Sequence, residues 1–229
     1  IGAGGSLTLD PVGIERHRPL QAVSETIGAC RALFSGVPAE SSGEFVQLRE
    51  ATIRGARSDI EIWLAGRGPL MLRLGATQAD GVMLEFIYKP QLGAVIDRVR
   101  QAAVQAGRQP KISYSTMVVT DDRSMAVAKQ HLSYRLVDSP ADVKAAIGLS
   151  DSDANLIRST MPQGLEAAGE LIREEWVLPF VISGTSSECA AELEELISAS
   201  SIDEFAVALL DAESAELTID KVSQILGKC

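Results

Sequence analysis

Residues 60–87 have the sequence IEIWLAGRGPLMLRLGATQADGVMLEFI. Two short apolar runs, at residues 60–65 and 81–87, flank a segment with helical spacing at residues 69–78. Apolar runs without alternation, bounded by turn residues, are typical of strands that are buried on both faces. A strand, a helix and a second strand in this order indicate a parallel pair that the helix covers. The stretch therefore predicts an α/β fold.

The alternation of helix and strand continues on both sides of this stretch. We expect further helices at residues 19–34, 91–106, 124–134, 185–199 and 217–226, several short helices at 139–176, and further strands at 1–4, 111–120 and 205–210. They make five strand–helix units, at residues 1–35, 60–78, 82–107, 111–199 and 205–226. We expect a single domain over residues 1–229, with a helical insertion at 140–176. Five units do not close a barrel, so the pattern leaves two alternatives. One is an open doubly wound sheet, and the other is a barrel whose first units precede Ile1.

The composition excludes several classes of function. Lys and Arg total 21 against 31 Asp and Glu, and a net charge of −10 repels the phosphate backbones of nucleic acids. Aromatic residues make up 4%, too few for base-stacking platforms. Three distant cysteines and two histidines predict neither a disulfide framework nor a metal site. No apolar run reaches the ~20 residues that span a bilayer, so we expect a cytoplasmic protein without a membrane segment.

The loop Ala65-Gly66-Arg67-Gly68-Pro69 is a candidate anion site. It follows an apolar strand and opens a helix, and its two glycines let the backbone come close to a ligand. Proline suits the first helical position, where its missing N–H costs nothing. The N–H groups of the first helical turn favour an anion, and the arginine adds a charge-assisted bond to a phosphate. The alternative is a tight strand-to-helix turn without a ligand.

A second glycine loop, Gly2-Ala-Gly4-Gly-Ser6, follows the first expected strand. Ligands of parallel α/β folds bind at the C-terminal ends of strands, where both glycine loops, Glu85 and Thr120 are expected. Glu85 fits either an acid–base group or a surface charge. Asp121 is expected to cap the following helix, and Arg16-His-Arg18 to form a solvated helix entry. No residue is identified as catalytic.

Several segments together resemble motifs of the luciferase-like flavin and deazaflavin oxidoreductases. They are RPLQAVSETI (18–27), ALFSG (32–36), SGEF (42–45), IEIWLAGRGPLML (60–72) with ADGV (79–82), and SGT (183–185). The combination GRGP…ADGV is the most specific of them. It is similar to the branch that includes methylenetetrahydromethanopterin reductase and related enzymes that use coenzyme F420.

The resemblance implies a (β/α)8 TIM barrel, of which this chain holds about five of the eight strand–helix units. The N-terminal units, expected upstream of Ile1, are then absent, and with them part of the cofactor pocket. The implied activity is F420-dependent hydride transfer to or from an organic substrate, with Gly4 and residues 65–69 binding the cofactor. We expect these 229 residues alone to be inactive and the complete protein to be a homo-oligomer acting on a small molecule.

Two alternatives to this activity stay open. One is an FMN-dependent monooxygenase of the same superfamily, and the other is an inactive half-barrel that acts as a binding or assembly module. Two positions depart from the family pattern. Gly5 stands where some relatives have an acidic residue, which weakens any transfer of a catalytic acid. Leu70 stands where a lysine is common, which leaves phosphate binding to backbone groups and Arg67.

Overall fold

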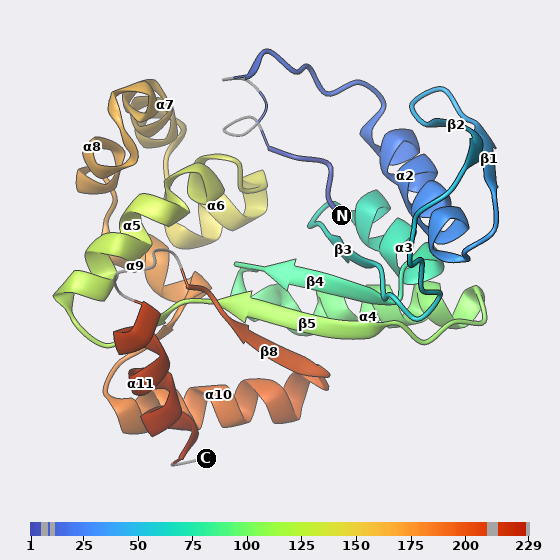
Figure 1. The fold of residues 1–229 in the computed structure, drawn as a ribbon. Coiled ribbons are helices and arrows are strands. Elements are labelled where there is room, and N and C mark those ends of the chain that lie inside the picture. Colours follow the sequence, from blue (N-terminus) through green and yellow to red (C-terminus); the bar gives the residue numbers. More distant parts are fainter. Residues whose placement is uncertain (6–8, 10–11, 210–214, 228–229) are drawn as a thin grey trace. The chain divides into compact units, whose positions relative to one another are not determined.

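The structure is a computed structural model and describes residues 1–5, 9, 12–209 and 215–227. The chain divides into two compact units, and Figure 1 labels most of their helices and strands. Unit 1 holds residues 1–85 and 95–113, and unit 2 holds residues 86–94 and 114–229. The expectation of a single domain over residues 1–229 stays a prediction.

Unit 1 combines parallel strands with helices and one small hairpin. Its elements are α2 (Pro19–Phe34), β1 (Ala39–Ser42), β2 (Gln47–Ala51), β3 (Trp63–Ala65), α3 (Pro69–Gln78), β4 (Gly81–Glu85), most of α4 (Leu92–Gln105) and the first half of β5 (Lys111–Thr116). β3 pairs in parallel with β4, with Leu64 opposite Val82, and both side chains are fully buried. β4 lies between β3 and β5 in the sheet, and β1 pairs antiparallel with β2. The parallel pair confirms the α/β prediction.

The apolar face of α2 forms one core of unit 1. Val23 and Ile27, one helical turn apart, are 4% and 2% exposed and cluster with Ile62 and Leu64. This is the packing expected of a helix with apolar residues every three or four positions. It attaches α2 to the first strand of the parallel pair.

Unit 2 is mostly helical. Its elements are η2 (Lys89–Gln91), the second half of β5, β6 (Val118–Val119), α5 (Asp122–Val137), α6 (Ala141–Ile147), α7 (Asp151–Thr160), η3 (Met161–Gln163), α8 (Leu165–Glu170), α9 (Glu174–Val177), η4 (Leu178–Phe180), β7 (Ile182–Ser183), α10 (Ser186–Ser200), β8 (Glu204–Val207) and α11 (Ala215–Leu226). β6 pairs in parallel with β7, and β8 is the sheet neighbour of β5. Buried Trp176, Phe180, Leu132 and Leu136 belong to one apolar cluster.

Most of the expected elements are confirmed, and two have the predicted bounds. Residues 19–34 and 69–78 are helical from end to end. The helix expected at 185–199 is observed as α10, and the side chains of Thr185 and Glu188 form a capping box at its start. Asp121 caps α5 as expected. The last expected strand, at 205–210, is observed as β8, and residue 210 lies outside the described residues.

Three strand predictions need correction. The strand expected at 81–87 ends at Glu85, because Phe86 has a left-handed backbone with φ +47°. The strand expected at 111–120 is split at Met117, where the partner changes: Ala208 N–H donates to the Thr116 carbonyl, and Ile182 N–H donates to the Met117 carbonyl. The strand β7 was not predicted, so the unit assigned to 111–199 contains two strand–helix segments rather than one. A two-residue strand is too short to give a periodic signal.

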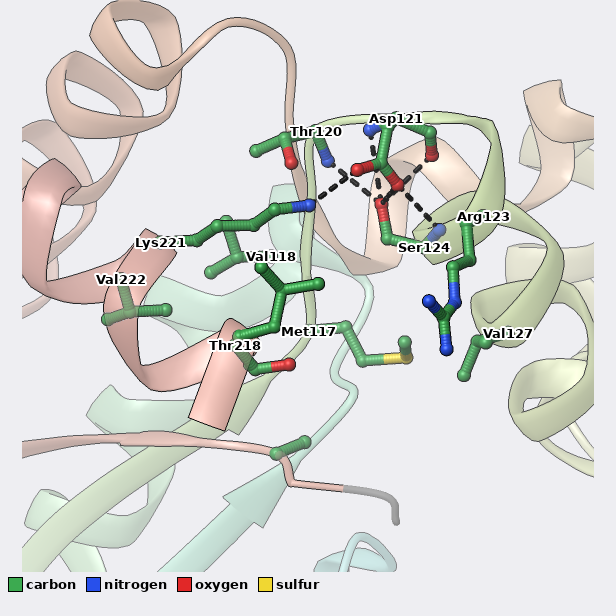
Figure 2. Close-up of a pocket in the computed structure, with 12 residues that line it drawn as sticks. Met117, Val118, Thr120, Asp121, Arg123, Ser124, Val127, Thr218, Lys221 and Val222 are labelled. Atoms are coloured by element: carbon green, nitrogen blue, oxygen red, sulfur yellow. Dashed lines mark hydrogen bonds and ion pairs between the residues drawn. The ribbon is translucent and has the colours of Figure 1, made fainter. Parts of the chain in front are cut away.

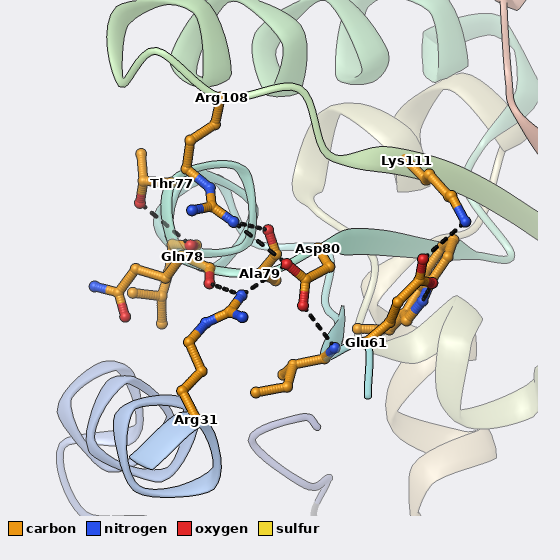
Figure 3. A network of polar contacts seen from close by, with 11 residues as sticks. Arg31, Glu61, Thr77, Gln78, Ala79, Asp80, Arg108 and Lys111 are labelled. Carbon is orange, nitrogen blue, oxygen red and sulfur yellow. Dashed lines mark hydrogen bonds and ion pairs between the residues drawn. The ribbon is translucent and has the colours of Figure 1, made fainter. Parts of the chain in front are cut away.

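One carboxylate, that of Asp80, joins several elements of unit 1 (Figure 3). It accepts hydrogen bonds from the Ile62 N–H (2.9 Å) and from the guanidinium of Arg31 on α2 (2.9 Å). Arg108, beyond α4, lies 3.5 Å from the same carboxylate and donates to the Ala79 carbonyl at 2.9 Å. The Asp80 backbone N–H also donates to the Ile62 carbonyl, and the Asp80 carbonyl accepts from the Lys111 N–H. The segment ADGV therefore has a structural role at the N-terminal ends of β3 and β4.

The pKa of Asp80 lies below its ordinary value. Burial acts to raise this pKa, but the hydrogen bonds from Arg31 and from the Ile62 N–H, together with the charges of Arg31 and Arg108, outweigh it. A carboxylate with a lowered pKa stabilises the fold above its unfolded-state pKa. It loses that contribution as the pH falls through the folded-state pKa.

We predict that Asp80→Asn lowers the free energy of unfolding by about 1.5–3 kcal/mol at neutral pH, because hydrogen bonds to a charged acceptor are lost. The difference from the unsubstituted protein should shrink as the pH falls below the ordinary aspartate value of 3.8. Urea unfolding at several pH values measures both effects. Asp59→Asn is the matched control, because Asp59 is exposed and its ion pair is with exposed Arg57 at 3.4 Å. Equal losses in the two variants would contradict this role for Asp80.

Gly81, directly after Asp80, has no room for a side chain. A Cβ at this position would lie 2.3 Å from the indole ring of Trp63, its parallel partner across β3 and β4. The Trp63 Nε1–H donates to Glu61 at 2.9 Å, and Glu61 also accepts from Lys111 at 2.9 Å. The ring is therefore held over the glycine by a polar contact at its edge.

We predict that Gly81→Ala destabilises the protein by about 1–3 kcal/mol, the usual cost of overpacking. Gly93→Ala is the control, because a Cβ there meets nothing within 4 Å and Gly93 lies in α4. Alanine in place of glycine in a helix should be stabilising by up to about 1 kcal/mol. Thermal unfolding followed by circular dichroism measures the stability of both variants. An equal loss of stability in Gly81→Ala and Gly93→Ala would contradict the role of the Trp63 ring.

Candidate functional site

The two predicted glycine loops lie together in unit 1. The Ile1 nitrogen donates to the Trp63 carbonyl at 2.7 Å, and the Ala65 N–H donates to the Ile1 carbonyl at 2.8 Å. This alternation is the pattern of a parallel ladder, so the first residues run alongside β3. A Cβ on Gly2 would lie 3.2 Å from the Ala65 carbonyl oxygen. The strand expected at 1–4 is not formed, since residues 1–5 are irregular and only Ile1 bonds to β3 in this way. The loop at residues 2–5 nevertheless begins beside the C-terminal end of β3, where the loop at residues 65–69 also lies.

The loop after β3 is tied to β4 at one end and to α3 at the other. The Gly66 N–H donates to the Met83 carbonyl at 3.4 Å, and the Leu72 N–H donates to the Gly68 carbonyl at 2.9 Å. Gly68 is the N-cap residue of α3 and Pro69 is the first helical residue. The first turn of α3 contains no acidic residue and no side chain caps it. Its N-terminal partial charge is therefore available to an anion.

The two glycines of this loop differ in their surroundings. A Cβ on Gly66 would lie 2.6 Å from the Cγ of Met71, so this glycine is required by packing. A Cβ on Gly68 would meet nothing within 4 Å. Arg67, between them, is exposed. The loop thus presents an open backbone position and a cation beside the start of α3.

The loop at residues 2–5 contains a contact that the sequence did not indicate. Gly4 has φ +70°, a backbone conformation that favours glycine, and a Cβ there would lie 2.9 Å from the side chain of Leu9. The Arg16 guanidinium donates to the Gly4 carbonyl at 3.3 Å. The sequence predicted Arg16 as part of a solvated helix entry, and no local pattern signals a bond to a loop twelve residues earlier. Ser6 lies outside the described residues.

The remaining predicted positions are divided between the units. Glu85 is exposed at the C-terminal end of β4, in unit 1. Leu70, at the position where the family commonly has lysine, is 63% exposed. Thr120 belongs to unit 2, where its N–H donates to the hydroxyl of Ser124 at 3.1 Å.

Unit 2 has a small pocket of its own, between the start of α5 and α11 (Figure 2). Its volume is about 70 Å³, too small for a flavin or deazaflavin ring system. Asp121 lies on its rim, accepts from the Ser124 N–H at 2.8 Å and pairs with Lys221. The bond from Lys221 and those from Ser124 hold the pKa of Asp121 well below its usual range. This carboxylate is committed to its ion pair and its helix cap, so it is a poor proton acceptor.

Within residues 1–5, 9, 12–209 and 215–227, no three His, Cys, Asp or Glu side chains gather where they could hold a metal ion. In that same part of the chain, no helix has both the length and the apolar character to cross a bilayer.

Comparison with known proteins shows the family of this chain. The family model described as luciferase-like monooxygenase matches residues 1–203. The chain therefore belongs to the luciferase-like monooxygenase family, a family of F420- and FMN-dependent oxidoreductases.

One curated relative is the 5,10-methylenetetrahydromethanopterin reductase of Methanolobus tindarius, which is 25% identical over 205 residues. The match covers 86% of this chain and 63% of that relative, so the chain spans less than two thirds of the relative's length. Two solved structures share the fold. The coenzyme F420-dependent tetrahydromethanopterin reductase from Methanopyrus kandleri has a TM-score of 0.80 at 22% identity, covering 97% of this chain and 71% of that one. An F420-dependent secondary alcohol dehydrogenase, in complex with an F420-acetone adduct, has a TM-score of 0.71 at 19% identity. The match covers 99% of this chain and 68% of that one.

Proposed function

We propose that the whole protein catalyses F420-dependent hydride transfer between the deazaflavin and a small organic substrate, and that residues 1–229 by themselves do not. The observation that carries the proposal is the meeting of two glycine loops at the C-terminal end of β3, one that follows β3 itself and one that follows Ile1, whose backbone bonds to β3. This end of the strands is where enzymes with parallel α/β folds bind their ligands. Membership of the luciferase-like family, in which relatives use F420 or FMN, and the similarity to a 5,10-methylenetetrahydromethanopterin reductase support the cofactor class.

The residues at the loop after β3 suit the phosphate of such a cofactor. Gly68 leaves space at the N-terminus of α3, the first turn has no carboxylate, and Arg67 adds a positive charge. In this proposal, Ala65, Gly66 and Pro69 shape the loop, and Gly4 lets the neighbouring loop turn beside it.

The bound deazaflavin would supply the carbon that donates or accepts the hydride. The contribution of the chain is to hold the cofactor by its phosphate and to fix its orientation. Glu85 is the ionisable side chain at the end of β4. In this proposal, its carboxylate gives or takes the proton that accompanies hydride transfer. We also propose that the protein works as a homo-oligomer on a small molecule.

The cofactor test begins with the purified whole protein, and residues 1–229 alone are assayed beside it and should show no turnover. We expect reduced F420 to bind and to be oxidised when a suitable organic acceptor is present, without oxygen uptake. Fluorescence titration with F420, followed by stopped-flow absorbance, measures binding and turnover. A yellow protein with bound FMN, oxygen uptake and no affinity for F420 would favour the monooxygenase alternative. Binding of neither cofactor would favour a non-catalytic module.

We predict that Arg67→Ala weakens cofactor binding by about 1.5–3 kcal/mol, or roughly 10- to 150-fold in Kd, because a charge-assisted hydrogen bond is lost. Gly68→Val should weaken binding through steric exclusion while leaving the fold intact, since a Cβ there meets nothing within 4 Å. The cofactor titration above measures both variants. Exposed Arg54→Ala is the control for net charge. Unchanged affinity in both loop variants would place the phosphate elsewhere.

A further inference from the structure

The chain makes a strained turn at residues 86–89, directly after β4. Its first residue, Phe86, has φ +47°, in the left-handed region that residues with a Cβ rarely adopt. Glycine would adopt this conformation without that strain. The Phe86 side chain is 9% exposed and belongs to the apolar cluster of unit 2. Such a conformation persists only where the surrounding structure holds it.

The peptide groups on both sides of Phe86 are held by other parts of unit 2. The Phe86 N–H donates to the Ser115 carbonyl at 3.0 Å. The Phe86 carbonyl accepts from the Nε–H of Arg135, on α5, at 2.7 Å. The angle φ of Phe86 is a rotation between these two planar peptide groups, so contacts that fix both planes also maintain the left-handed turn.

Arg135 is an arginine in the interior of unit 2. It is 7% exposed, and its guanidinium carbon lies 5.8 Å from the centre of the Phe180 ring. Burying a charged side chain costs free energy, and an apolar residue of similar size often stabilises a protein equally well. An apolar residue at this place on α5 would, however, lack the donor that the Phe86 carbonyl accepts. The turn after β4 therefore gives a reason for the arginine.

The residues that follow Phe86 are anchored in the same unit. The hydroxyl of buried Tyr114 donates to the Ile87 carbonyl at 3.5 Å. The ammonium group of Lys89 forms an ion pair with Glu192 on α10. These contacts hold the later part of the turn, whereas Arg135 acts on the carbonyl group of the strained residue itself.

We propose that Arg135 is a positioning residue for Glu85, the last residue of β4. The peptide plane on the N-terminal side of Phe86 includes the Glu85 carbonyl, so its orientation sets one of the two backbone angles of Glu85. A general acid or base works only within hydrogen-bond reach of the reacting atom, so the direction of its side chain matters. The inference rests on the proposed function, because that proposal assigns the proton to the Glu85 carboxylate.

The test is a double-substitution cycle in the whole protein, assayed with reduced F420 and the acceptor that supports turnover in the cofactor test. Glu85→Gln should lower kcat by about 100-fold. Arg135→Gln should lower kcat by roughly 10- to 100-fold through misplacement of the carboxylate, and it should leave the Kd for F420 unchanged. In the Glu85→Gln background, Arg135→Gln should lower kcat no further, since no carboxylate is left to position. Equal effects of Arg135→Gln in the two backgrounds would overturn the proposal.

A second measurement follows the turn itself and needs no substrate. Hydrogen exchange of the Phe86 amide should be roughly tenfold faster in Arg135→Gln than in the unsubstituted protein. Arg135→Met, which fills the space without a donor, replaces Arg135→Gln in both measurements if the latter fails to fold. Unchanged exchange of the Phe86 amide would also overturn the proposal.

Arg158→Gln is the matched control. Arg158 lies in unit 2 as well, and its guanidinium donates to a backbone carbonyl, that of Val137, at 3.1 Å. Its substitution removes the same kind of bond at a distance from the turn along the chain. It should change neither kcat nor the exchange of the Phe86 amide, and effects as large as those of Arg135→Gln would contradict a specific role for Arg135.

Failure of the proposed function gives a different result from failure of this inference. If the unsubstituted whole protein does not turn over F420, or if Glu85→Gln leaves turnover unchanged, the proton role of Glu85 is wrong and its positioning by Arg135 is wrong with it. If turnover depends on Glu85 but Arg135→Gln acts equally in both backgrounds, the proposed function stands and this inference alone is wrong.

Discussion

The Asp80 carboxylate holds together parts of unit 1 that are distant in the sequence. It receives donors from α2, from the residue before β3 and from the segment after α4, and its own backbone bonds to the start of β5. A carboxylate with 28% of its side chain exposed needs such partners, since an unpaired charge at this depth is costly. The same hydrogen bonds fix where β3 begins. Because β3 is only three residues long, the position of its first residue also determines that of its last.

The two ends of the parallel strands consequently have separate roles. The N-terminal ends carry the Asp80 network and the contact of Trp63 with Gly81, which stabilise the sheet. The C-terminal ends carry the glycine loops, where the backbone is open and a cation is exposed. The two halves of the GRGP…ADGV combination thus lie at opposite ends of the strands, so the same short stretch contributes both to stability and to the proposed cofactor site.

Local patterns predicted the helices well and the strands less completely. The helices at 19–34 and 69–78 begin with proline and have a strong apolar period, so their limits are visible in the sequence. The strand β7 was missed because two residues have no period, and its place depends on pairing with β6 over 60 residues away. The bond of Arg16 to the Gly4 carbonyl was missed for a related reason, since it depends on the path of a loop rather than on spacing. The proximity of the two glycine loops was predictable, because parallel strands end on the same side of a sheet.

Three glycines within residues 60–87 show how packing and function can be separated. Gly81 is required because the indole of Trp63 occupies the space of a side chain, and Gly66 because Met71 does so. Packing therefore explains both without any ligand. Gly68 has no such neighbour, and its backbone angles of φ −68° and ψ 143° are open to any residue. Neither contact nor conformation requires glycine at this position, so an open backbone here is what the proposed approach of a cofactor phosphate would use.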